Sequence, residues 1–144
     1  MSGIITQLCT TIQGEGPSAG QSCLLIRLGN CNLNCSFCDT KWTNRLKLNE
    51  IPSIKSTTDS LPVKIETNEE MDTFIDMCKV HISNYIIKRA LITGGEPFLN
   101  EKFLKELLTT LYRKLNITTV EIETNGTLLN NNFFNKDLQP AFNI

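Results

Sequence analysis

The sequence lacks an apolar run long enough to span a membrane, and its first residues show no basic stretch followed by an apolar core, the mark of a secretory signal. An excess of basic residues is also missing: the net charge is −1 at pH 7, which argues against nucleic acid as a direct partner. We find no internal repeat and no low-complexity segment. A cytoplasmic protein without a membrane partner is therefore expected, folded as a single domain over residues 1–144.

A fourth cysteine is missing from the most distinctive segment, GNCNLNCSFCDT, where Cys31, Cys35 and Cys38 have the spacing C-x3-C-x2-C. A closed zinc site uses four protein ligands, so three thiols on one polar loop favour an iron–sulfur cluster with one iron left open. Six cysteines could also form a disulfide framework, but their clustering favours metal binding in a reducing compartment. The remaining alternative is a zinc site completed by Cys9, Cys23 or His81.

Short apolar runs alternate with helical patterns along the chain. Strands are expected at residues 4–11, 23–28, 89–93 and 118–123. One helix should start at a capping box of Thr67 and Glu70 and reach about residue 83, and a second should be capped by Asn100. Residues 45–66 read as an excursion, and a weaker helical pattern surrounds Phe133 and Phe134. This alternation predicts an α/β fold with a mostly parallel sheet.

Three segments with chemical potential each follow an expected strand: the cysteine loop, GGEP at residues 94–97 and TNG at residues 124–126. The carboxyl ends of parallel strands meet at one edge of a sheet, where α/β proteins place their active sites. We therefore expect the three segments to come together. The glycine pair would let the backbone approach a ligand closely, because no Cβ intervenes.

The cysteine spacing and the TGGEP segment at residues 93–97 resemble those of the radical S-adenosylmethionine (SAM) enzymes. A narrower resemblance, to 7-carboxy-7-deazaguanine synthases, rests on TIQGEG (11–16), IRL (26–28), CDT (38–40) and ETNGT (123–127), which occur in the family's order. The fold that it implies is a partial radical SAM (βα) barrel. The matching region runs over most of the chain, from about residue 11 to residue 127.

The resemblance also implies a lyase reaction. Reductive cleavage of SAM at a 4Fe-4S cluster gives a 5′-deoxyadenosyl radical, which abstracts hydrogen from 6-carboxy-5,6,7,8-tetrahydropterin. Ring contraction and loss of ammonia then give 7-carboxy-7-deazaguanine for queuosine-type deazapurine biosynthesis. Magnesium, an electron donor such as flavodoxin, and a homodimer are further implications of the resemblance.

Each matching residue takes a role from the resemblance. Cys31, Cys35 and Cys38 would bind the cluster, and the Thr40 hydroxyl would bind magnesium, which prefers oxygen ligands. The SAM site would be lined by Phe37, Cys38, Asp39, Gly95, Glu96 and Asn125. The pterin would contact Ile12, Gln13, Gly14, Arg27 and Thr93. Among these, the planar guanidinium of Arg27 suits bidentate binding of a carboxylate.

Other interpretations stay open. Arg27 could be a surface charge, Thr40 a turn cap, and residues 124–126 only a tight turn. No Ser-Pro-Lys segment follows Thr127, where the synthase family has another cofactor contact, so the chain is expected to be truncated at its C-terminus. The alternative functions are a glycyl-radical activase for a partner such as anaerobic ribonucleotide reductase, and a non-catalytic remnant that binds a cluster. The residues QGEG (13–16) and DT (39–40) argue against the activase.

Overall fold

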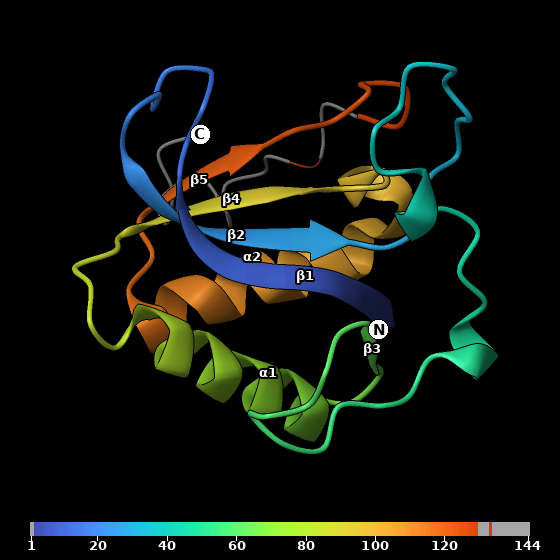
Figure 1. The fold of residues 1–144 in the computed structure, drawn as a ribbon. Helices are drawn as coiled ribbons and strands as arrows, with labels where there is room; N and C mark the ends of the chain where they lie inside the picture. Colours follow the sequence, from blue (N-terminus) through green and yellow to red (C-terminus); the bar gives the residue numbers. More distant parts are fainter. Residues whose placement is uncertain (1, 130–132, 134–144) are drawn as a thin grey trace.

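A five-stranded sheet with two helices on one face forms the part of the chain that the computed structural model describes, residues 2–129 and 133 (Figure 1). The strands are β1 (Gly3–Ile12), β2 (Ser22–Leu28), β3 (Val63–Ile65), β4 (Arg89–Gly94) and β5 (Thr119–Ile122). The helices are α1 (Asn68–Ile82) and α2 (Glu101–Leu115), with short 3-10 turns η1 (Lys41–Thr43), η2 (Leu48–Glu50) and η3 (Pro97–Asn100).

The sheet is mixed, with the order β3-β1-β2-β4-β5. The pairs β2–β4 and β4–β5 are parallel as predicted, but β1 is antiparallel to both β2 and β3. The expectation of a mostly parallel sheet is corrected for this half, because a short hairpin joins β1 to β2 and a parallel pair needs a longer crossover. The α/β class is confirmed.

One face of the sheet carries the core, and on the other face the described part of the chain places no helix (Figure 1). Successive side chains of a strand point to opposite faces. On β2, Leu24, Ile26 and Leu28 accordingly belong to the core beneath α1 and α2, whereas Arg27 lies on the open face. The expected stripe of α2 is buried in the same core, from Phe103 to Leu111.

The helix boundaries follow their predicted caps. Thr67 Oγ1 accepts a hydrogen bond from the Glu70 amide, and the Glu70 carboxylate accepts from the Thr67 amide, which is a complete capping box. Asn100 caps α2 by accepting from the amide of Phe103, and Asn116 ends that helix with a left-handed backbone at φ 54°. Among the described residues no helix is both long and apolar enough to cross a membrane.

The excursion over residues 45–66 contains one strand that the sequence pattern does not predict. The three residues of β3 pair with β1 from Gly3 to Ile5 and extend the sheet at that side. Three residues are too few to display a period, so this strand is defined by its pairing with β1 and by a bridge between Ser53 and Lys64 on its other side. Further along, Phe133 is fully buried and its ring lies edge-on to Phe98 at 4.7 Å, while Phe134 and the rest of that helical pattern lie outside the described residues.

The chain leaving β4 is pressed against the chain leaving β2. The amide of Gly95 donates to the carbonyl of Leu28 at 3.0 Å, and the amide of Glu96 donates to the carbonyl of Asn30 at 2.7 Å. A Cβ on Gly95 would lie only 1.7 Å from the oxygen of Asn30, and one on Gly94 would lie 2.3 Å from the oxygen of Leu28. The glycine pair therefore makes room for another segment of the same chain.

The capping box yields a pH-dependent prediction. Burial alone would raise the pKa of Glu70, but hydrogen bonds from the amides of Glu66 and Thr67 and from the Ser53 hydroxyl outweigh it and lower this pKa. A carboxyl with a lowered folded-state pKa stabilises the fold fully above its ordinary pKa and loses that effect as the pH falls through the folded value. The stability difference between wild type and Glu70→Gln should therefore shrink in acid, as measured by urea unfolding. Thr67→Ala should cost about 1 kcal/mol at neutral pH. If the difference in unfolding free energy between wild type and Glu70→Gln did not depend on pH, Glu70 would not have the lowered pKa assigned to it.

The close approach at β4 yields a second prediction. Gly95→Ala should lower the free energy of unfolding by about 1–3 kcal/mol, because the new methyl group has to displace a backbone carbonyl. Gly14→Ala is the matched control, since a Cβ on Gly14 has nothing within 4 Å. Chemical denaturation of the two variants measures the comparison. Equal stability would show that the loop after β2 moves aside without cost.

Candidate active site

The cysteine loop is closed at its base by Asn30, which directly precedes the first cysteine. Its amide donates to the carbonyl of Thr43 at 2.8 Å, and its side chain both accepts from the amide of Leu46 at 2.6 Å and donates to that residue's carbonyl at 3.0 Å. Asn30 has a positive φ of 70°, a conformation that asparagine tolerates better than most residues. These contacts fix both ends of residues 30–46, so the loop stands as a unit beyond β2.

The three predicted ligands lie on this loop as free, half-buried thiols. The backbone amide of Leu33 donates to Cys31 Sγ at 3.4 Å, and Cys38 Sγ lies 3.6 Å from the hydroxyl of Thr40. Within residues 2–129 and 133, no three side chains of the metal-binding types already converge on one point. The donor set nevertheless fits an iron–sulfur cluster, because three accessible thiols share one short loop and an amide already points at one sulfur.

The remaining cysteines and the histidine are placed away from this loop. Cys9 lies within β1, paired with Leu25. Cys23 is the second residue of β2, at the opposite end of the strand from the loop, and Cys78 lies in the core on α1. Burial, followed by the charge of Glu121, raises the pKa of the Cys23 thiol, and burial alone raises the pKa of Cys78 strongly. His81 is exposed near the end of α1. The zinc alternative is disfavoured by this placement.

Glu96 is 1% exposed, and both oxygens of its carboxylate are in use. Oε1 accepts from the amide of Phe98 at 2.9 Å and from the hydroxyl of Thr124 at 2.8 Å. Oε2 accepts from the amide of Asn125 at 2.8 Å. This residue, predicted from sequence as a cofactor contact, therefore ties the segment after β4 to the segment after β5.

The turn of residues 124–127 touches the cysteine loop through a ring of side chains. Asn125 Nδ2 donates to Asn32 Oδ1 at 3.0 Å, Asn32 Nδ2 donates to Thr127 Oγ1 at 2.9 Å, and Thr127 Oγ1 donates to Asn125 Oδ1 at 2.7 Å. Asn125 Nδ2 also lies 3.9 Å from Cys31 Sγ. The three segments predicted to meet beyond the parallel strands do meet there.

The residues predicted to bind the pterin divide into two groups. Arg27 and Thr93 are register partners on β2 and β4, and both lie on the open face next to the cysteine loop. The Arg27 Nε donates to Gln7 Oε1 at 2.9 Å. Ile12, Gln13 and Gly14 instead begin the hairpin after β1, at the other end of β2, and Ile12 is exposed. The open face separates the two groups.

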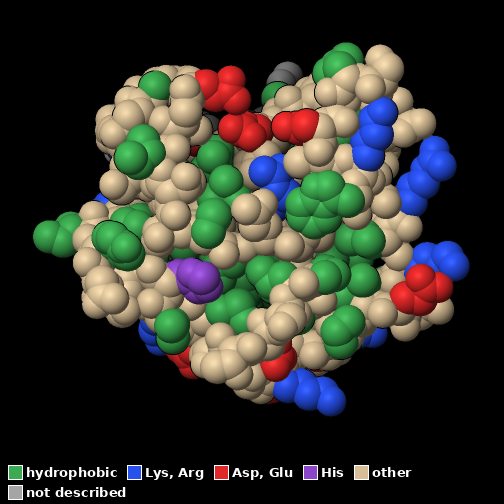
Figure 2. Space-filling model, viewed as in Figure 1, with side chains coloured by type: hydrophobic (Ala, Val, Ile, Leu, Met, Phe, Trp, Pro, Cys, Tyr) green, Lys and Arg blue, Asp and Glu red, His purple; other side chains and the backbone are tan. Residues whose placement is uncertain are grey.

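The hairpin leans back over that face and is held by β5. Gln13 is only 5% exposed, and its Nε2 donates to Glu121 Oε2 at 3.1 Å. Its backbone amide and carbonyl are bonded to Gln21 and Gly20 within the hairpin. Figure 2 shows acidic and basic side chains gathered in the hollow between hairpin and cysteine loop. A cavity of about 400 Å³ lies along β5, lined by hairpin residues, by residues 120–124, and by Phe98 and Leu129.

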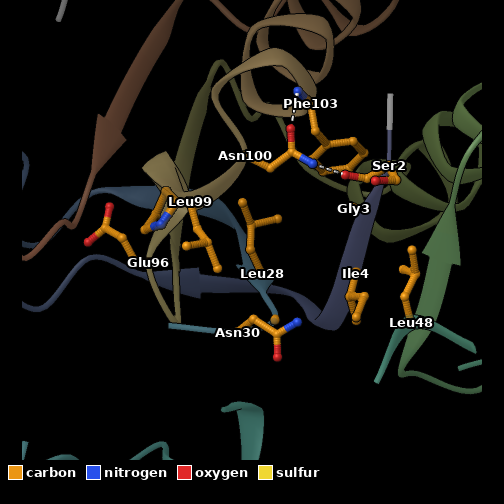
Figure 3. Close-up of a pocket in the computed structure, with 12 residues that line it drawn as sticks. Ser2, Gly3, Ile4, Leu28, Asn30, Leu48, Glu96, Leu99, Asn100 and Phe103 are labelled. Carbon is orange, nitrogen blue, oxygen red and sulfur yellow. Dashed lines mark hydrogen bonds between the residues drawn. The ribbon is translucent and has the colours of Figure 1, made fainter. Parts of the chain in front are cut away.

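A smaller cavity lies behind the cysteine loop (Figure 3). Its volume is about 190 Å³, and Leu28, Asn30, Leu99 and Glu96 line the side next to the loop. The close-up shows the carboxylate of Glu96 turned away from this space. On the outer surface of the loop, Phe37 is 87% exposed and Asp39 is exposed as well. Both predicted cofactor residues are therefore accessible to a ligand that lies over the loop.

Several residues that hold the site together were not predicted from the sequence to do so. Asn30, Asn32 and Thr127 occur in loops where polar residues are common, and their partners are distant in sequence. Glu121 was predicted only as part of a strand, yet its Oε1 is buried without a hydrogen-bond partner among the described residues, 3.8 Å from Arg89 Nη1. A charged residue within a short apolar strand was the one signal that could have drawn attention to it.

Comparison with known proteins links this geometry to a family. The profile of the Radical SAM superfamily matches residues 25–139. A 7-carboxy-7-deazaguanine synthase of Clostridium acetobutylicum is 34% identical over 140 residues, which cover 97% of this chain and 53% of that protein. The synthase of Hyperthermus butylicus is 32% identical over 124 residues, which cover 86% of this chain and 43% of that protein.

A solved structure supports the same relationship. The crystal structure of QueE from Escherichia coli is similar with a TM-score of 0.67 and 28% sequence identity, over 88% of this chain and 54% of that chain. The mixed, open α/β sheet therefore corresponds to part of the QueE fold, as the predicted partial barrel requires. The chain spans about half the length of the relatives that it matches. It belongs to the radical SAM superfamily and is similar to the 7-carboxy-7-deazaguanine synthases along that half.

Proposed function

We propose that this chain is a radical SAM lyase that converts 6-carboxy-5,6,7,8-tetrahydropterin to 7-carboxy-7-deazaguanine. The observation that carries the proposal is the meeting of the cysteine loop, residues 94–97 and residues 124–127 at one edge of the sheet, beside an open polar face. The superfamily implies a 4Fe-4S cluster and SAM. The pterin, magnesium, an electron donor such as flavodoxin and a homodimer belong to the proposal.

The chain's own residues would hold the cofactors. Cys31, Cys35 and Cys38 would bind the cluster, which supplies the electron that cleaves SAM and starts radical chemistry. Phe37 and Asp39 would flank the cofactor from the loop, and Gly95, Glu96 and Asn125 from the sheet edge. The half-buried hydroxyl of Thr40 would be one of the oxygen ligands of magnesium.

The open face would hold the substrate. Arg27 makes no ion pair with any described residue, and the side chain to which it donates a hydrogen bond, Gln7, is neutral. The terminal guanidinium nitrogens therefore remain able to bind the pterin carboxylate in a bidentate fashion. Thr93, in register beside Arg27, would contact the ring, and the backbone of Ile12, Gln13 and Gly14 would close the hairpin side.

Anaerobic reconstitution tests the proposal in two steps. Wild-type protein should take up about four irons per chain, and Cys31→Ala, Cys35→Ala and Cys38→Ala should each abolish this uptake, whereas Cys78→Ala should not. The loaded protein should release 5′-deoxyadenosine from SAM under reducing conditions. Adding the pterin should then yield the deazaguanine product. Tight zinc binding without iron would refute the cluster, and iron uptake without 5′-deoxyadenosine would leave the remnant. Release of 5′-deoxyadenosine without product would leave the activase.

Arg27→Ala tests the substrate assignment by itself. Loss of a charge-assisted pair in a closed site costs on the order of 2–5 kcal/mol, so the variant should bind the pterin much more weakly while its iron content stays normal. Arg113→Ala is the control, because Arg113 is an exposed cation on α2. Equilibrium binding of the pterin to both variants provides the measurement. Unchanged affinity in Arg27→Ala would return this residue to the role of a surface charge.

A further inference from the structure

The sulfur of Cys31 differs from the other predicted ligands in its surroundings. It receives N–H donors from two separate segments, the backbone of Leu33 at 3.4 Å and the side chain of Asn125 at 3.9 Å. Cys38 Sγ lies beside the hydroxyl of Thr40 instead. The Leu33 donor belongs to the loop itself, but the Asn125 donor comes from the segment after β5, 94 residues away in sequence.

The orientation of the Asn125 amide is set by its neighbours. The backbone amide of Thr127 donates to one end of the side chain at 2.9 Å, which identifies that atom as the oxygen Oδ1. The hydroxyl of Thr127 donates to the same oxygen. The nitrogen Nδ2 must therefore face the other way, toward Asn32 Oδ1 and Cys31 Sγ.

The turn of residues 124–127, which carries Asn125, is itself held in place by Glu96. The buried carboxylate accepts from the Asn125 amide and the Thr124 hydroxyl, and its other contact, the amide of Phe98, anchors it to η3. Hydrogen bonds to an ionised group are stronger than neutral ones, and a buried polar group that loses its partner is costly. Residues 124–127 are exposed and would otherwise have little packing to hold them.

We propose that Glu96 is a positioning residue for the iron–sulfur cluster: it locks the turn of residues 124–127 so that Asn125 Nδ2 donates a hydrogen bond to the Cys31 sulfur. Hydrogen bonds to ligand sulfurs withdraw negative charge and make a cluster easier to reduce. The contact would raise the reduction potential of the cluster through one of its three ligands. This inference rests on the cluster assignment of the proposed function and adds to it a role for residues that contact no iron.

The first measurement tests the hydrogen bonds between Glu96 and residues 124–125 in protein that carries no cluster. In Glu96→Gln, either orientation of the new amide places an NH2 group against a donor, the Phe98 amide on one side or the Asn125 amide on the other. The hydrogen–deuterium exchange rate of the Asn125 backbone amide, measured by NMR in the protein without a cluster, should then rise by about tenfold or more. Glu106→Gln is the matched control, because Glu106 is an exposed carboxylate on α2. Unchanged exchange in Glu96→Gln would overturn the proposal.

The second measurement reads the cluster. An anaerobic redox titration, monitored by the EPR signal of the reduced cluster, should give a more negative midpoint potential for Glu96→Gln and for Asn125→Ala than for wild type or Glu106→Gln. If Glu96 acts through Asn125, the double variant should shift no further than Asn125→Ala alone. Additive shifts, or an unchanged potential in Glu96→Gln with fast exchange at Asn125, would overturn the positioning role.

A milder pair of variants covers the case in which Glu96→Gln does not fold. Thr124→Val removes one donor to the Glu96 carboxylate and should shift exchange and potential in the same directions by a smaller amount, and Thr124→Ser should restore both. No shift in Thr124→Val would then overturn the proposal. Failure of the wild-type chain to take up iron would instead refute the cluster assignment, and with it any role of Glu96 toward the cluster.

Discussion

The site depends on the contact between two backbones that leave neighbouring parallel strands. The chain after β4 can lie against the chain after β2 only because residues 94 and 95 have no side chains. A Cβ on Gly95 would lie 1.7 Å from the backbone oxygen of Asn30, which is far too close for two atoms that are not bonded. Two backbone hydrogen bonds close this contact. The cysteine loop, the Glu96 carboxylate and the turn after β5 all take their positions from it.

One face of the sheet packs the core and the other forms the candidate site, and the alternation of side chains along each strand keeps the two sets of residues apart. Every second residue of β2, β4 and β5 joins the core under the helices, and the residues between them supply Arg27, Thr93 and Glu121 to the open face. Charged and hydroxyl groups can therefore stand next to one another on this face without disturbing the core. The antiparallel β1 brings its hairpin to the far end of the same face, opposite the cysteine loop.

The cysteines fall into groups that differ in physical state. Cys23 and Cys78 are fully buried, and burial raises the pKa of each thiol, which keeps it protonated and inert. The three thiols of the loop are half-buried, and the sulfurs of Cys31 and Cys38 lie close to an N–H or O–H group. A thiolate needs such donors and access to solvent, so the fold itself separates residues suited to metal binding from those that serve as small apolar side chains.

The sequence alone determined most of the elements and singled out the candidate cluster ligands. Strong local signals exist for both: the capping box at Thr67, the apolar stripe of α2, and three cysteines within eight residues. Tertiary structure decided what has no local signal. The strand β3 exists through its pairing with β1, the antiparallel direction of β1 follows from the hairpin, and the glycine pair at residues 94–95 makes room for the chain that leaves β2. Glu96 acquires its place through partners up to 29 residues away, because a buried carboxylate must find donors wherever the fold brings them.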